Sequence, residues 1–177
     1  PGGIRQKLSL ACVLLHEPPV VFLDEPTAGV DPVARRGFWD IISGLSHRGM
    51  TVFLTTHFLD EAEYCHDLGF ISAGRVVAGG SPSDLRSRFA SSPLFEVRSR
   101  DYATVERLLG SWDRCAEIYL SGPRVHVFTR GGAGGDDVAS RLTSAGVAFE
   151  SIARIPPSME DIFIMLTRSA EEARAVA

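Results

Sequence analysis

The chain has 177 residues, of which 45% are hydrophobic and 23% charged, and its 22 acidic and 18 basic side chains give a formal net charge of −4. This composition excludes wholesale disorder, and no uncharged apolar run reaches the ~18–20 residues that a membrane-spanning helix needs. The mild acidity argues against a protein that binds a nucleic-acid backbone, and three scattered cysteines without a CxxC pair favour reduced thiols in a cytosolic compartment.

Helical and extended patterns alternate along the first half of the chain. In chain order they predict a helix, a strand, a helix, a strand, a helix, two strands and a helix, over Leu8–His16, Val20–Leu23, Val33–Leu45, Thr51–Thr56, Leu59–Cys65, Leu68–Ser72, Arg75–Ala78 and Ser81–Phe89. The apolar runs VVFL and TVFLTT are typical of strands buried on both faces of a parallel sheet. Asp31 and Pro32 supply an N-cap and a first-turn proline for the helix after them. This alternation predicts an α/β domain.

The pattern changes after residues 90–93 (ASSP), which we interpret as a linker. Beyond them the expected order is strand, helix, strand, strand, helix, strand, over Leu94–Arg98, Tyr102–Leu109, Cys115–Leu120, Val125–Thr129, Asp136–Ala145 and Val147–Ile155. This βαββαβ order is that of a small ferredoxin-like α+β fold. A final amphipathic helix is expected after Ser158. The sequence therefore predicts two domains, with their boundary near residue 90.

The chain contains a single lysine, Lys7, which follows Gln6. A phosphate-binding loop of the G-x-x-x-x-G-K-[ST] type needs a lysine directly after a glycine, so no such loop is present in these residues. The chain also begins with Pro1 rather than Met, and we expect the natural protein to continue upstream of it. We therefore expect the 177 residues alone to be inactive towards nucleotides.

Asp24 and Glu25 follow the apolar run VVFL, at the predicted C-terminal end of a strand. Ligands of open α/β folds bind at that edge of the sheet. There, one carboxylate can hold Mg²⁺ beside phosphate groups while the other orients or deprotonates an attacking water molecule. A bare Asp-Glu pair before a proline is more often only a solvated turn. The specific Thr-Ala-Gly-Val-Asp loop that follows makes the catalytic interpretation stronger.

The stretch VVFLDEPTAGVDP, from Val20 to Pro32, resembles the Walker B motif and D-loop of the nucleotide-binding domain of ABC transporters. The resemblance implies that Asp24 binds Mg²⁺, that Glu25 is the catalytic base and that Asp31 is the D-loop aspartate. His57, after TVFLTT, stands where the family has its switch histidine, which senses the γ-phosphate of ATP. The resemblance covers residues 1 to about 89 and is specific because its motifs occur together and in order.

The first residues, PGGIRQKL, resemble the end of the family's signature motif. Two glycines before a helix let backbone N–H groups approach an anion at the positive helix end. The resemblance implies that Gly2 and Gly3 contact ATP bound to the opposite subunit of a head-to-tail dimer. The family usually has a serine before the two glycines, whereas this chain has Pro1, which offers neither a hydroxyl nor an N–H group.

The resemblance implies a fold, a function and a set of partners. Residues 1–89 would be the C-terminal part of a three-layer P-loop NTPase (ABC ATPase) domain, and residues 94–177 a small C-terminal domain. The ending PPSMEDIFIMLT resembles that of ATP-binding subunits of ABC-2-type exporters. Such a subunit binds ATP and Mg²⁺, pairs with a second nucleotide-binding domain as a homo- or heterodimer and drives a separate membrane permease. It lies in the cytoplasm on the inner face of the membrane, without inserting into it or binding nucleic acid.

Other interpretations remain open from the residues alone. The chain could come from an ABC-type ATPase of DNA repair, chromosome organisation or translation, although its acidity and the residues of its motifs favour a transporter. It could also act only as a regulatory or dimerisation module, because residues 94–155 contain no catalytic pattern. A zinc site in the tract HFLDEAEYCHD, from His57, Glu61, Cys65 and His66, is less favoured because zinc ligation would need four convergent nitrogen or sulfur donors.

Overall fold

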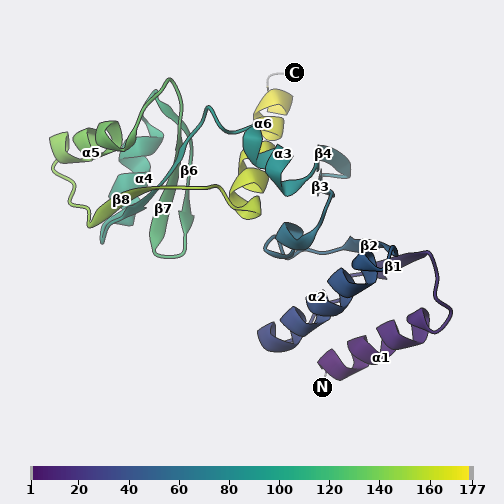
Figure 1. Ribbon diagram of the computed structural model, residues 1–177. Helices are drawn as coiled ribbons and strands as arrows, with labels where there is room; N and C mark the ends of the chain where they lie inside the picture. Colours follow the sequence, from purple (N-terminus) through teal and green to yellow (C-terminus); the bar gives the residue numbers. More distant parts are fainter. Residues whose placement is uncertain (1, 176–177) are drawn as a thin grey trace. The chain divides into compact units, whose positions relative to one another are not determined.

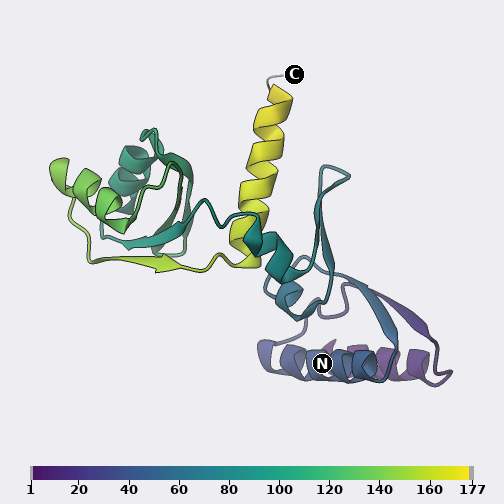
Figure 2. The ribbon, with the colours of Figure 1, turned by 45° about the horizontal axis from the view of Figure 1, so that its top comes forward.

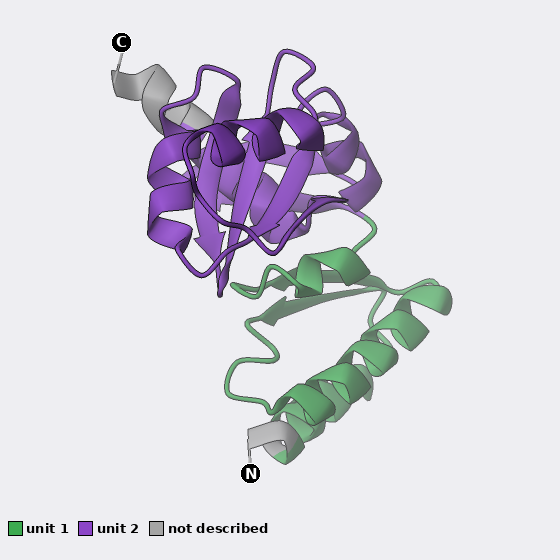
Figure 3. Ribbon diagram, turned by 90° about the vertical axis from the view of Figure 1, so that its left-hand side faces the viewer, with its two compact units in different colours: residues 1–66 green, residues 67–177 purple. Residues whose placement is uncertain are grey.

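The structure is a computed structural model that describes the backbone of residues 2–175, and the side chains of residues 4 and 6–168. Pro1, at the position where the signature serine was expected, lies outside the described residues. The chain divides into two compact units, residues 1–66 and 67–177, which Figure 3 shows in different colours. Each unit has its own core.

The N-terminal unit contains two helices, two strands and one 3₁₀ turn. In chain order these are α1 (Gly2–Leu14), β1 (Val20–Asp24), α2 (Pro32–His47), β2 (Thr51–Thr55) and η1 (Glu61–Tyr64). The expected helices and strands all appear, but η1 is a single 3₁₀ turn where a helix over Leu59–Cys65 was predicted. The residue that precedes η1, Asp60, makes no side-chain cap, which removes one helix-starting contact.

Helix α1 begins six residues earlier than expected, at Gly2, so the two glycines lie within its first turn rather than before it. Helix α2 begins as predicted. The carboxylate of Asp31 accepts hydrogen bonds from the backbone N–H groups of Val33 and Ala34, at 3.1 and 3.0 Å, and Pro32 is the first helical residue. Gly49 follows the end of α2 with φ +88°, a left-handed conformation that glycine adopts at little cost.

Strands β1 and β2 pair in parallel, in a register that places Asp24 opposite Thr55. Helices α1 and α2 lie side by side in Figures 1 and 2. Their apolar side chains form a core with residues of the strands: Leu10, Phe38, Trp39 and Ile42, with Leu23, Val52 and Leu54 packed against them.

The expectation that β1 and β2 are buried on both faces is wrong for this structure. Phe22 and Phe53 are 75% and 60% exposed and lie on the face away from the helices, where their rings contact each other at 5.5 Å. Successive side chains of a strand point to opposite faces, and within the described residues only one face of this two-stranded sheet is covered by helices.

The C-terminal unit begins with a hairpin and a short helix: β3 (Leu68–Ser72), β4 (Arg75–Gly80) and α3 (Pro82–Ser87). These were predicted at the same places, but as part of the N-terminal domain. They belong to the C-terminal compact unit because α6 (Met159–Ala175) packs against them (Figure 2). The rings of Phe70 and Phe163 are 5.3 Å apart, and Arg86 Nε donates to the carbonyl of Pro157 at 3.1 Å. The compact units therefore divide between residues 66 and 67. The predicted domains, residues 1–89 and 94–177 with a linker at 90–93, stay a prediction.

The predicted βαββαβ order is confirmed in the rest of the unit. It consists of β5 (Leu94–Arg98), α4 (Tyr102–Gly110), β6 (Cys115–Ser121), β7 (Arg124–Thr129), α5 (Gly135–Ser144) and β8 (Ser151–Ile155). The strands form an antiparallel sheet in the order β6-β7-β5-β8, as in a ferredoxin-like fold. The last strand begins at Ser151 rather than at Val147.

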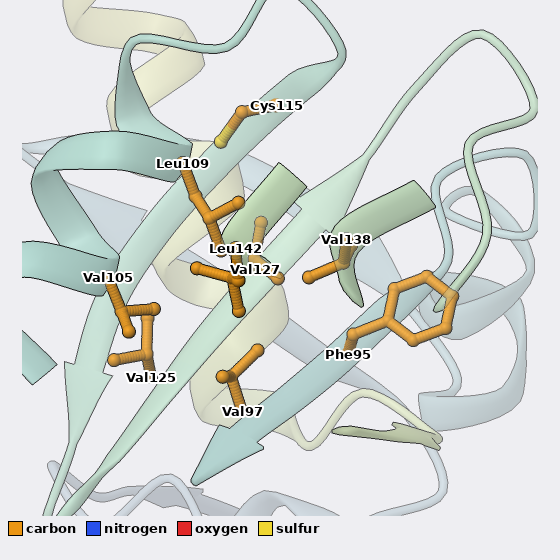
Figure 4. Packing of buried hydrophobic residues seen from close by; sticks show 9 residues of the cluster. All are labelled: Phe95, Val97, Val105, Leu109, Cys115, Val125, Val127, Val138 and Leu142. Atoms are coloured by element: carbon orange, nitrogen blue, oxygen red, sulfur yellow. The ribbon is translucent and has the colours of Figure 1, made fainter. Parts of the chain in front are cut away.

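Two layers of apolar side chains cover the faces of this sheet. Figure 4 shows the larger cluster, which joins the sheet to α4 and α5: Phe95, Val97, Val105, Leu109, Cys115, Val125, Val127, Val138 and Leu142. A second cluster contains Leu94, Tyr119 and Phe128, with Ile164 and Met165 of α6 packed against it. The terminal helix is therefore part of the fold of this unit, as its amphipathic pattern predicted.

Candidate functional site

The candidate site lies where β1 and β2 end side by side. Because the strands are parallel and in register, the loops that follow Asp24 and Thr55 leave the sheet at the same edge. Thr55 Oγ1 donates to Asp24 Oδ1 at 2.5 Å. The backbone N–H of Glu25 donates to the carbonyl oxygen of Thr55 at 3.2 Å. The two loops are thus connected through backbone and side-chain hydrogen bonds.

Glu25 and His57 are brought together at this edge. The Nδ1 atom of the His57 ring is 2.7 Å from Glu25 Oε2, and the backbone N–H of His57 donates to the same oxygen at 3.4 Å. The side chains of His57 and Glu25 are 61% and 35% exposed, so a water molecule or a phosphate group can reach both. Sequence resemblance alone gave these two residues catalytic roles, and the fold places them in direct contact.

The backbone of Glu25 is strained. Its φ of +44° is left-handed, an unfavourable region for a residue with a side chain, and such a conformation costs on the order of 1–3 kcal/mol. The residue after it is Pro26, whose ring disfavours the α region for its predecessor. Strain of this kind persists only where the surroundings hold the backbone in place, and the hydrogen bond between Glu25 N–H and Thr55 does so here.

Asp24 is exposed at the end of β1, next to this pair. A carboxylate and a threonine hydroxyl are oxygen donors, the ligand type that Mg²⁺ prefers, and this ion commonly keeps waters and substrate phosphates as its other ligands. The residues at this edge thus fit an Mg²⁺ ion that is completed by nucleotide. Within the residues that the structure describes, no group of three His, Cys, Asp or Glu side chains could hold a metal ion by itself.

Asp31 serves as the N-cap of α2. Hydrogen bonds from the backbone, that of Ala34 first, hold the pKa of Asp31 below its ordinary value, and the charge of Lys7 acts in the same direction. Among the described interactions, Asp31 makes none with Glu25 or His57. Gly2 and Gly3, in the first turn of α1, likewise remain a predicted contact for nucleotide.

A cluster around Glu61 was not foreseen as part of the site. Its carboxylate is only 1% exposed and accepts hydrogen bonds from Thr27 Oγ1 at 2.6 Å and from Thr56 Oγ1 at 2.7 Å. Arg35 of α2 places its Nε 3.5 Å from the same carboxylate. From the sequence, Glu61 is notable only as a possible zinc ligand. In the structure, hydroxyl groups in the interior engage this carboxylate.

Comparison with proteins of known sequence identifies the relatives of this chain. Over 114 residues, which are 64% of the chain and 19% of the relative, it is 52% identical to the probable multidrug ABC transporter ATP-binding protein YbhF of Escherichia coli K12. Over 169 residues, 94% of the chain and 51% of the relative, it is 36% identical to the Nod factor export ATP-binding protein I of Rhizobium etli. The chain is a member of the ABC transporter ATP-binding protein family.

This family member spans about half the length of the Nod factor export relatives and about a fifth of YbhF. No family model matches it. Among solved structures, an ATP-binding subunit of an ABC transporter is 36% identical over 49% of the chain and 37% of that subunit, with a TM-score of 0.44. No helix among the described residues is long and apolar enough to cross a membrane.

Proposed function

We propose that the protein containing this chain hydrolyses ATP and uses the energy to drive export through a separate membrane permease. The observation that carries this proposal is the contact between Glu25 and His57 at the common edge of β1 and β2, with Asp24 beside them. Two relatives support the transport role, because their names describe multidrug transport and Nod factor export.

In the proposed reaction, Glu25 orients a water molecule and accepts its proton while the water oxygen attacks the γ-phosphorus. The bond between this phosphorus and the bridging oxygen breaks, so that ADP and phosphate are the products. Asp24 would hold an Mg²⁺ ion, which would supply positive charge beside the phosphate oxygens when bound. A protonated His57 ring can donate from Nδ1 to Glu25 and from Nε2 to a γ-phosphate oxygen, which would fix both groups around the water.

The proposal extends to the parts that act across an interface. Gly2 and Gly3 would contact the γ-phosphate of ATP held by a second nucleotide-binding domain, and Asp31 would lie in the loop between the two domains. A single exposed helix end contributes only about 0.3–1 kcal/mol to anion binding, so these glycines cannot bind ATP without the opposite domain. The phosphate-binding lysine would come from residues upstream of this chain, and the whole assembly would work at the inner face of the membrane with its permease.

The decisive experiment replaces Glu25 by glutamine in the natural protein that carries this chain. Glutamine keeps the size of the side chain but cannot accept the proton, so we expect kcat for ATP hydrolysis to fall about 10²–10⁴-fold while ATP binding is retained. Glu17→Gln, at an exposed glutamate of the same unit, is the matched control and should leave kcat unchanged. Turnover by Glu25→Gln at the wild-type rate would refute the catalytic assignment.

A further inference from the structure

We propose that Glu61 is a positioning residue for ATP hydrolysis, which holds the loop of Glu25 and the loop of His57 at a fixed separation. This inference rests on the proposed function and adds a residue to its machinery. Glu61 does not touch the place where phosphate would react. It acts through the two threonines next to the reacting groups, one on each loop.

The geometry of the carboxylate supports this role. Thr27 follows Glu25 by two residues and donates its hydroxyl to Glu61 Oε1 at 2.6 Å. Thr56 directly precedes His57 and donates to the other oxygen, Oε2, at 2.7 Å. Each oxygen of one rigid, planar group therefore binds one loop. The distance between the two carboxylate oxygens is fixed by covalent geometry, so the group sets the separation of the loops.

Burial makes these bonds hard to replace by water. Thr27 is 0% and Glu61 1% exposed, so a broken hydrogen bond would leave a buried polar group without a partner, which is unfavourable and more so for a charge. Arg35 faces the carboxylate, with its Nε 3.5 Å from Oε1. A buried carboxylate with two hydroxyl donors and a facing guanidinium is a satisfied group, and it keeps its neighbours in one arrangement.

Arg35 adds a second connection to the histidine. Its guanidinium carbon lies 3.7 Å from the centre of the Phe58 ring, a cation–π contact. The ring of Phe58 is in turn 4.0 Å from the ring of His57. The imidazole is therefore supported by Phe58 and Arg35 as well as by the bond that Thr56 makes to Glu61. Misplacement of reacting groups by about 1 Å can cost about 100-fold in rate, so such support matters for catalysis.

The threonines provide the sharpest test, because their methyl and hydroxyl groups can be removed separately. Thr27→Val and Thr56→Val keep the shape but lose the hydroxyl, whereas Thr27→Ser and Thr56→Ser keep the hydroxyl. We expect both valine variants to lower the single-turnover rate of ATP hydrolysis per bound nucleotide about 10–100-fold, and both serine variants to stay within about threefold of wild type. The KM for ATP should change less than kcat in all four.

Glu61→Gln tests the carboxylate itself. A glutamine has one acceptor oxygen, so it cannot accept from both threonines, and we expect the same loss of kcat as in the valine variants. Combining Glu61→Gln with Thr27→Val should add little further loss, because either change already breaks the link between the two loops through residue 61. Asp60→Asn, at the exposed carboxylate before Glu61, is the control and should match wild type.

The outcomes separate this inference from the function on which it rests. If the natural protein does not hydrolyse ATP, or if Glu25→Gln leaves its hydrolysis intact, the proposed function fails, and the role of Glu61 with it. If Glu25→Gln abolishes hydrolysis but the rate per bound nucleotide is unchanged in Glu61→Gln and in both valine variants, only the positioning role is overturned. A loss of thermal stability with a normal rate per bound nucleotide would likewise overturn it, since that result means that Glu61 is merely structural.

Discussion

Asp161, near the start of α6, is a buried carboxylate with an unusual number of donors. It is 3% exposed and accepts hydrogen bonds from the Tyr119 hydroxyl, from His126 Nδ1 at 2.8 Å, and from both the backbone N–H and the hydroxyl of Ser158 at 2.7 and 2.6 Å. On its far side, His126 faces Glu96, whose Oε2 lies 3.8 Å from Nε2. These contacts join α6 to β6 and β7 of the sheet.

Burial by itself would raise the pKa of Asp161, but the hydrogen bonds from His126, Ser158 and Tyr119 outweigh it and bring the pKa to about 2. The same burial, together with the facing carboxylate, raises the pKa of Tyr119. The pKa of Glu96 is also lowered: burial opposes the shift, but hydrogen bonds from Arg98 and Arg124 prevail. Asp161 is therefore charged at neutral pH and is held in that state by the folded structure.

We predict that Asp161 stabilises the C-terminal unit at neutral pH and that this contribution is lost in acid. Its folded pKa lies below the ordinary value of 3.8, so the stabilisation is complete above about pH 4 and disappears as the pH falls towards 2. The shift corresponds to about 2 kcal/mol. Asp161→Asn should remove about that much from the free energy of unfolding at pH 7 and weaken its dependence on acid.

Urea unfolding followed by circular dichroism at a series of pH values measures this effect. Asp113→Asn, at an exposed carboxylate in the same unit, is the control and should keep the wild-type acid dependence. Other carboxylates with lowered pKa values contribute to the wild-type curve, so the difference between wild type and Asp161→Asn is the quantity to compare. A difference that stays constant between about pH 5 and pH 2 would contradict the prediction.

At the scale of elements, the sequence was most informative where a local signal decides the structure. Asp31 caps α2, Ser81 caps α3 in a capping box with Asp84, and β3 and β5 have the predicted bounds. These features depend on residues within a few positions of each other. The prediction for η1 was wrong because Glu61 turns inward to residues that lie 5 and 34 positions away, which no local pattern reveals.

The exposed face of β1 and β2 leads to a prediction about association. Val20, Phe22 and Phe53 are all exposed there, and among the described residues the two strands pair only with each other, so each has an open edge. Open edges and exposed aromatic surface favour contact with another chain. We expect the 177-residue chain to self-associate as its concentration rises.

Sedimentation velocity over a range of concentrations tests this expectation. Phe53→Lys places a charge on the apolar face and should shift the chain towards the monomer. Leu15→Lys changes another exposed apolar residue, 79% exposed but outside the strands, and should leave association as in wild type. A wild-type chain that stays monomeric at all concentrations, or equal effects of the two lysines, would show that this face does not mediate association.

For the whole molecule, the sequence and the structure contributed different parts of the candidate site. Asp24, Glu25 and His57 could be named from the order of motifs, because the strands that deliver them are apolar runs with polar residues at their ends. The sequence could not show that Glu25 adopts a left-handed backbone or that Glu61 joins their loops. Both depend on the pairing of β1 with β2, which brings residues about thirty positions apart into contact.

We predict that the 177-residue chain alone does not hydrolyse ATP, because it supplies only some of the groups that the reaction needs. Glu25, His57 and Asp24 supply groups for the attack and for Mg²⁺, but binding of the phosphates requires a lysine after a glycine. The only lysine, Lys7, lies on α1 after Gln6. We expect no magnesium-dependent release of phosphate above background from the purified chain. Glu25→Gln in the same chain is the control for a contaminating ATPase, because the substitution would leave the activity of a contaminant unchanged. Hydrolysis by the wild-type chain that Glu25→Gln abolishes would contradict the prediction, because it would mean that these residues bind the nucleotide without a phosphate-binding loop.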